Sequence, residues 1–249
     1  MAHDGARPTL LLDAGTGLRR VTELLRGRPF EGSILLGHLH WDHTQGLPFF
    51  RAGDRPDARV DLHLPAQGDD PAGVLARGMS PPHFPIGPDQ LRGTWRFHAL
   101  DEGRRSIEGF EVLAREIPHK GGRTFGYRIS DATATFAYLS DHHPVGLGPG
   151  PDGFGPYHPA ARELVSGVDL LIHDAQYTAD EFPSRADFGH SSIDYAVGLA
   201  GACDVRSLLL FHHDPARTDE ELDTIEAGLR NAPVAVSLAI EGDVIALAP

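Results

Sequence analysis

Residues 34–43 read ILLGHLHWDH, an apolar run followed at once by a cluster of potential metal ligands. The ligands are imidazoles and a carboxylate, from His38, His40, Asp42 and His43. A chain that leaves the end of a buried strand can point such closely spaced side chains at one place, and this set suits a borderline ion such as Zn²⁺. A solvated surface cluster is the alternative, but apolar residues on both flanks disfavour it. The stretch therefore predicts a metal site at a strand end.

The 249-residue chain holds 15 histidines and one cysteine, which limits the metal chemistry open to it. Cys203 by itself can form neither an intrachain disulfide nor a thiolate cluster, so a bound metal must rest on His and Asp. Asp and Glu number 35 against 22 Lys and Arg, a net charge of −13 that disfavours a broad nucleic-acid-binding face. No stretch reaches the roughly 18 apolar residues of a membrane span, and residues 1–9 lack the apolar core of a signal peptide. We expect a cytoplasmic protein with no membrane partner and no extended nucleic-acid partner.

Short apolar runs alternate with turn signals and helical patterns along the chain, which is typical of a layered α/β (α+β) protein. We predict strands at 9–12, 33–36, 60–64, 94–98, 107–113, 124–129, 135–139, 169–172, 207–211, 234–238 and 244–247. We predict helices at 18–26, 44–50, 159–166, 193–200 and 218–229, the last with Thr218 and Glu221 as a capping box. The chain length favours a single domain over residues 1–249, with a Pro- and Gly-rich, lid-like insertion near 51–88.

Further motifs follow in order, and together they resemble the metallo-β-lactamase fold of binuclear hydrolases. The motifs are DAGTG at 13–17, HLHWDH at 38–43, EIPHKGG around His119, AYLSD ending at Asp141 and LLLFHH around His212. The match runs from about Thr9 to Pro215. The resemblance implies a four-layer αββα sandwich, in which two packed sheets have helices outside.

The resemblance also implies two divalent metal ions, Zn²⁺ in preference to Mn²⁺. One ion would be held by His38, His40 and His119, and the other by Asp42, His43 and His212. Asp141 would bridge the two ions, and Asp42 would orient a bridging hydroxide that acts as the nucleophile.

A second pair of motifs, IHDAQY and FGHSS, resembles the branch that contains tRNase Z and small phosphodiesterases. There Asp174 and His190 would join Asp42 as catalytic residues, because an imidazolium held by a carboxylate can protonate a poor alkoxide leaving group near pH 7. The alternative is that His190 only caps a helix that begins near Ser191. His173 lies inside an apolar run, so we expect a hydrogen-bonded core residue there.

The spacing of the motifs favours a compact substrate. A tRNase Z needs a protruding arm between its third and fourth ligand motifs, but only 22 positions separate His119 from Asp141, and two predicted strands fill most of them. The stretch 79–86 (MSPPHFPI) looks like a stiff lid. Its His83 and Phe84, together with Ser191, are the candidate substrate contacts, although Phe84 could instead pack against its own scaffold.

We therefore expect a binuclear metal-dependent phosphodiesterase that cleaves a small phosphodiester, of which a cyclic nucleotide is one candidate. Three alternatives stay open: a tRNase Z-like ribonuclease, a lactone or ester hydrolase, and a catalytically silent metal-binding module. The branch that the motifs resemble implies a homodimer. Related chains usually begin with one more strand and a glycine-rich loop, and here only eight residues precede Thr9, so we expect that edge to be missing.

Overall fold

The computed structural model describes residues 1–3, 6–68 and 70–247. Contacts within the chain divide it into two compact units. The first unit comprises Met1–Asp101, Ser106–Gly109 and Gly121–Arg123, and the second comprises Glu102–Arg105, Phe110–Lys120 and Thr124–Pro249. The single hydrolase domain expected from the sequence remains a prediction. Among the described residues, no helix has both the length and the apolar character that crossing a membrane requires.

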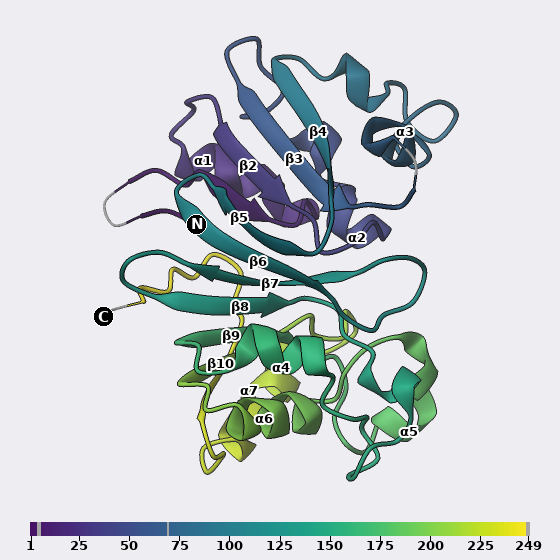
Figure 1. Cartoon of the computed structure of the whole chain (residues 1–249), viewed down its shortest axis with the longest axis vertical. Coiled ribbons are helices and arrows are strands. Elements are labelled where there is room, and N and C mark those ends of the chain that lie inside the picture. The colour runs from purple at the N-terminus through teal and green to yellow at the C-terminus, as the bar shows by residue number, and fades with distance from the viewer. Residues whose placement is uncertain (4–5, 69, 248–249) are drawn as a thin grey trace. The chain divides into compact units, whose positions relative to one another are not determined.

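The first unit carries a four-stranded parallel sheet in the order β1-β2-β3-β4 (Figure 1). Its strands are β1 (Leu10–Leu12), β2 (Glu31–Leu35), β3 (Arg59–Pro65) and β4 (Thr94–Leu100). Its helices are η1 (Thr16–Arg20), α1 (Val21–Leu24), α2 (Trp41–Thr44), η2 (Leu47–Phe49), α3 (Pro71–Ala76) and η3 (Pro88–Gln90). Burial alternates along β3, so that Val60, Leu62 and Leu64 enter the core of this unit.

The second unit carries a seven-stranded mixed sheet in the order β11-β10-β9-β8-β7-β6-β5 (Figure 1). Its strands are β5 (Gly103–Ile107), β6 (Phe110–Glu116), β7 (Phe125–Ser130), β8 (Thr135–Leu139), β9 (Leu170–Asp174), β10 (Ser207–Phe211) and β11 (Ala235–Leu238). Its helices are η4 (Pro144–Leu147), α4 (Pro159–Val165), α5 (Phe182–Arg185), η5 (Ala186–Phe188), α6 (Ile193–Ala202) and α7 (Asp219–Gly228). Helices α4 and α6 pack on the sheet and share its core. Two sheets with flanking helices confirm the predicted α/β (α+β) class.

Two predicted strands are wrong. The run 107–113 is broken where Glu108 and Gly109 form a turn with positive φ, so that β5 ends before it and β6 begins after it. The run 244–247 is irregular, and Val244 is 88% exposed. Alternation of apolar residues gives a segment the pattern of a strand, but a strand also needs a partner, and β11 is already the last strand of this sheet.

Two further elements differ from the sequence-based expectation. The helix predicted at 44–50 is instead α2, which begins inside the HLHWDH motif, followed by the 3₁₀ turn η2. Pro48 cannot donate a backbone hydrogen bond, so a continuous helix is disfavoured there. The insertion expected near 51–88 is also not one lid. It contains β3, which pairs on both sides, and α3, whose Leu75 is buried in the core.

Candidate functional site

The HLHWDH motif (38–43) lies in the first unit, where it follows β2 and runs into α2. His38 and His43 are buried, His40 is half-buried and Asp42 is exposed. The ring of His38 lies 4.3 Å from the ring of His40 and 4.2 Å from that of His43. The predicted clustering of these imidazoles at a strand end is therefore confirmed within this unit.

Asp13, just after β1, fixes the orientation of His43. Its Oδ2 lies 2.8 Å from His43 Nδ1, and its Oδ1 accepts the backbone N–H of Gly37 at 2.7 Å. An ionised carboxylate only accepts, so Nδ1 donates and a neutral His43 keeps its lone pair on Nε2. Nε2 faces Asp42 Oδ2 at 3.2 Å, which is the arrangement of a histidine prepared to bind a metal. Sequence reasoning assigned Asp13 no such role, although the DAGTG motif was the available signal.

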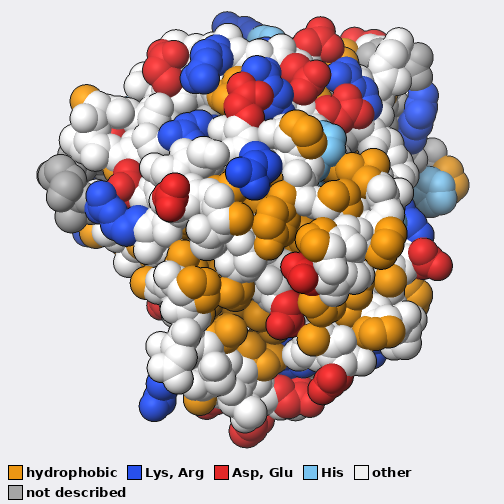
Figure 2. All heavy atoms as spheres, turned by 60° about the horizontal axis from the view of Figure 1, so that its bottom comes forward, with side chains coloured by type: hydrophobic (Ala, Val, Ile, Leu, Met, Phe, Trp, Pro, Cys, Tyr) orange, Lys and Arg blue, Asp and Glu red, His pale blue; other side chains and the backbone are white. Residues whose placement is uncertain are grey.

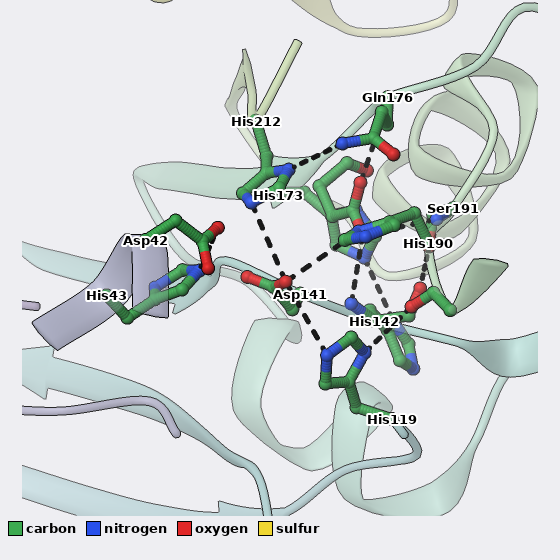
Figure 3. Close-up of polar contacts among 12 residues, drawn as sticks. Asp42, His43, His119, Asp141, His142, His173, Gln176, His190, Ser191 and His212 are labelled. Carbon is green, nitrogen blue, oxygen red and sulfur yellow. Dashed lines mark hydrogen bonds and ion pairs between the residues drawn. The ribbon is translucent and has the colours of Figure 1, made fainter. Parts of the chain in front are cut away.

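Asp141 follows β8 and lies at the centre of a histidine cluster in the second unit (Figure 3). Three imidazole nitrogens surround its Oδ2: His119 Nε2 at 3.6 Å, His212 Nε2 at 3.6 Å and His190 Nδ1 at 3.7 Å. Asp141 is 1% exposed. Asp141, His190 and His212 also form a group whose ligand atoms lie within 4.8 Å of one another. The second unit thus brings the later predicted ligands together around one buried carboxylate.

His119 is held by the backbone near His190. Its Nδ1 donates to the carbonyl of Gly189 at 2.8 Å, so in the neutral ring the lone pair is on Nε2, the atom that faces Asp141. Gly189 has a φ of +106°, and a Cβ there would lie 3.3 Å from the His119 ring. Glycine therefore suits this position both by its conformation and by the space it leaves.

Gln176, which sequence reasoning did not identify, lies beside His212. The two side chains meet at 3.0 Å between the amide of Gln176 and Nδ1 of His212 (Figure 3). The nitrogen and oxygen of the Gln176 amide exchange places when the amide is turned by 180°. When the oxygen faces the ring, His212 donates to it from Nδ1 and keeps the lone pair of Nε2 for a metal. The sequence pointed to Gln176 only through its position, two residues after Asp174 at the end of β9.

Asp174 is fully buried and accepts four hydrogen bonds. Its Oδ2 accepts from the backbone N–H groups of His142 at 3.0 Å and Ser191 at 3.2 Å and from His190 Nδ1 at 3.1 Å. Its Oδ1 accepts the backbone N–H of Gln176 at 3.2 Å. This set of donors matches an ionised carboxylate, and it fixes the His190 ring with Nδ1 toward Asp174.

The alternative role of His190 as a helix cap is wrong. The N-cap of α6 is Ser192, whose hydroxyl accepts the backbone N–H of Tyr195 at 3.0 Å. The imidazole of His190 stacks instead on that of His212, with ring centres 4.8 Å apart. His190 therefore belongs to the histidine cluster and not to the helix terminus.

A family model described as the β-lactamase superfamily domain matches residues 9–213. The chain belongs to this superfamily. Ribonuclease Z of Pyrococcus furiosus is 25% identical, over 85% of this chain and 79% of the relative. Ribonuclease Z of Bacillus cereus is 25% identical, over 82% of this chain and 78% of the relative.

Solved structures share the fold of this superfamily chain. A diphosphatase from the PhnP family has a TM-score of 0.68 and 20% identity, over 99% of this chain and 83% of its own. Human tRNase Z, short form, has a TM-score of 0.64 and 20% identity, over 95% of this chain and 87% of its own. These findings confirm the metallo-β-lactamase fold and the tRNase Z-like branch that the motifs indicated.

His173 is a buried core residue of this β-lactamase-superfamily chain, as expected. Its Nδ1 donates to the carbonyl of Asp174 at 2.6 Å, and its Nε2 lies 3.1 Å from His142 Nδ1. Burial lowers the pKa of both imidazoles, that of His142 well below its usual range. His143 is buried as well, and its Nε2 donates to the carbonyl of Ala186 at 2.9 Å.

The candidate substrate contacts differ in their surroundings. His83 is exposed. Phe84 is half-buried, packs against the core of the first unit and meets the ring of Phe49 edge-on at 5.8 Å. Ser191 is fully buried and donates its hydroxyl to the carbonyl of His142 at 2.7 Å. The proposed substrate contact of Ser191 is therefore corrected to a structural one, because its hydroxyl is already committed to the backbone.

Proposed function

We propose that the chain is a binuclear metal-dependent hydrolase that cleaves small phosphodiesters, cyclic nucleotides among them. The observation that carries the proposal is the Asp174–His190 pair beside Asp141. Hydrolysis of a phosphodiester with a basic alkoxide leaving group needs a proton donor, whereas hydrolysis of a thioester does not, because a thiolate leaves more easily. His190 is held by Asp174 through Nδ1, so its Nε2 is the nitrogen that donates.

Two divalent ions, Zn²⁺ or Mn²⁺, belong to the proposal. We assign His38, His40 and His119 to one ion, Asp42, His43 and His212 to the other, and Asp141 to both. The side chains fit this role, because hydrogen bonds hold His43 and His119 so that Nε2 carries the lone pair in each. When bound, such ions supply Lewis acidity and lower the pKa of a coordinated water. Asp42, whose carboxylate is 55% exposed, is the side chain that we assign to orienting the nucleophile.

A tRNA-processing ribonuclease is the second candidate, because the curated relatives described above are named ribonuclease Z. Two observations favour a smaller substrate. The segment between His119 and Asp141 is occupied by β7, β8 and their tight turn, which leaves no length for a gripping arm there. Lys120 is the only lysine, and the net charge is −13.

We also propose a cytoplasmic homodimer. Apolar side chains gather on one face of the molecule (Figure 2), and homodimer interfaces are more apolar than the rest of a protein surface. Sedimentation analysis of the purified chain tests the dimer, and a monomer at all concentrations would contradict it.

A substrate panel tests the proposed function. Purified protein with added Zn²⁺ or Mn²⁺ is offered bis(p-nitrophenyl) phosphate, cyclic nucleotides, linear dinucleotides, precursor tRNA and lactones. We expect turnover of the small diesters, its loss in Asp141→Asn, and its retention in Asp152→Asn, which changes an exposed carboxylate of the same unit. If only precursor tRNA is cleaved, the protein is a ribonuclease. If only lactones are turned over, it is an ester hydrolase. Metal binding without any turnover identifies a silent module.

A further inference from the structure

Trp41 is an exposed aromatic residue inside the ligand motif. Its side chain is 69% exposed, although it stands between the predicted ligands His40 and Asp42. The other tryptophan behaves differently, since Trp95 packs against the core and donates its indole N–H to the carbonyls of Gly53 at 3.1 Å and Arg92 at 3.0 Å. Trp41 is not part of that core. Its indole N–H donates to no group in the described part of the chain.

The backbone that carries Trp41 is fixed. The carbonyl of Trp41 accepts the backbone N–H of Gln45 at 2.8 Å. The carbonyl of His40 accepts from the backbone N–H of His43 at 3.1 Å and from the hydroxyl of Thr44 at 3.2 Å. The indole edge is also close to the chain after α3, because a Cβ built on Gly78 would lie 3.8 Å from Trp41 Nε1. The indole is thus presented to solvent from a rigid turn.

A purely structural role does not explain this side chain. A ring that is 69% exposed contributes little burial energy, so packing gives no reason for a tryptophan between two predicted ligands. Consecutive Cα atoms are about 3.8 Å apart. A phosphodiester held at the ions that we assign to His40 and Asp42 would therefore have its substituents close to the indole.

We propose that Trp41 is a stacking platform for a nucleobase, which makes nucleotidyl phosphodiesters, and not simple alkyl ones, the preferred substrates. The inference rests on the proposed phosphodiesterase function. Every nucleobase has a π-face that stacks on an aromatic side chain, and such contacts need no positive charge. This suits a protein whose net charge is −13 and which must still retain an anionic substrate.

Two esters with the same leaving group test the platform. Thymidine 5′-(p-nitrophenyl phosphate) and methyl p-nitrophenyl phosphate release the same p-nitrophenolate and differ in the nucleoside. Trp41→Ala should lower kcat/KM for the thymidine ester by roughly 5-fold to 150-fold, mainly through KM, and should change the methyl ester little. Trp41→Phe should restore most of the loss, because a ring remains. Equal losses on both esters would overturn the inference.

A binding experiment tests the same idea without catalysis. In Trp95→Phe, Trp41 is the only tryptophan, and we expect thymidine 5′-monophosphate to quench its fluorescence while ribose 5-phosphate does not. If that variant fails to fold, the difference between the wild type and Trp41→Phe gives the same signal. Quenching without hydrolysis of either ester would reject the proposed function, and with it the substrate preference, and would keep only the stacking of a nucleobase on Trp41. Hydrolysis of both esters without quenching or base preference would reject the inference alone. A further outcome is that Trp41→Ala changes the sedimentation of the protein while the preference for the thymidine ester stays as in the wild type and the single-tryptophan variant shows no quenching. That result would overturn the inference and identify Trp41 as a contact between two copies of the chain.

Discussion

The Oδ2 atom of Asp174 lies 3.1 Å from Nδ1 of His190, and the same oxygen also accepts backbone N–H groups from His142 and Ser191. A carboxylate fixed by several donors cannot turn away from the imidazole without leaving those donors unpaired in a buried place. Asp174 therefore determines which nitrogen of His190 points away from it. It acts through His190 and is a positioning residue in the proposed reaction.

Replacing His190 by Ala should lower turnover of a cyclic nucleotide by roughly 10² to 10⁴, the range for loss of a positioned proton donor. The loss should be much smaller on bis(p-nitrophenyl) phosphate, because p-nitrophenolate leaves without protonation. Steady-state kinetics on the two substrates measure the difference. Because Asp141, His190 and His212 could themselves hold an ion, the metal content must be measured on the same sample. Loss of an ion, or equal slowing on both substrates, would show that His190 is a ligand.

Asp174→Asn should show the same dependence on the leaving group, but more weakly, because it removes the partner of His190 and leaves the proton donor in place. An equal fall in activity on both substrates would indicate a folding defect instead.

Asp141→Asn should release metal from the purified protein, whereas Asp152→Asn should retain the wild-type content. We expect close to two divalent ions per wild-type chain by elemental analysis. The buried imidazoles of His142 and His143 are unsuitable controls, since their loss disrupts hydrogen bonds in the core. One ion or none in the wild type would contradict the binuclear assignment.

Asp13→Ala should weaken binding of the ion assigned to His43 by roughly 10-fold to 100-fold, the usual cost of removing the partner that orients a ligating histidine. Gln176→Leu should do the same for the ion assigned to His212, because it removes the contact to Nδ1. Competition with a chromophoric chelator measures both affinities. Unchanged affinity in a variant with wild-type circular dichroism would refute the corresponding role.

Glu181 should make the stability of the chain sensitive to acid. Burial by itself would raise the pKa of Glu181, but hydrogen bonds from Arg217 and Thr178 lower it to about 2. This pKa lies below the ordinary value of 4.5, so ionised Glu181 stabilises the folded chain. The stabilisation is fully present above pH 4.5 and is lost as the pH falls toward 2. Glu181→Gln should lower the free energy of unfolding at pH 7 by on the order of 1 to 2 kcal/mol, after allowance for partial solvent screening. Urea unfolding at pH 7 and pH 3 should show a smaller difference at pH 3, and Glu220→Gln, on the exposed face of α7, is the control.

The sequence by itself determined the features that depend on neighbouring residues. The bounds of β8 and β10 follow from short apolar runs between turn signals. Helix α7 begins where Thr218 and Glu221 predicted it, because a capping box joins residues only three apart. The HLHWDH motif likewise predicted a cluster of imidazoles after a buried strand, since ligands spaced this closely need no distant part of the chain to meet.

Only the tertiary structure decided which distant groups hold those ligands. Asp13 and His43 are 30 residues apart, and Gln176 and His212 are 36 apart, so no local pattern pairs them. The same reason explains why residues 244–247 have the pattern of a strand and form none. Periodicity shows what a segment can bury, whereas strand pairing and the orientation of a histidine ring depend on which atoms the rest of the chain places beside it.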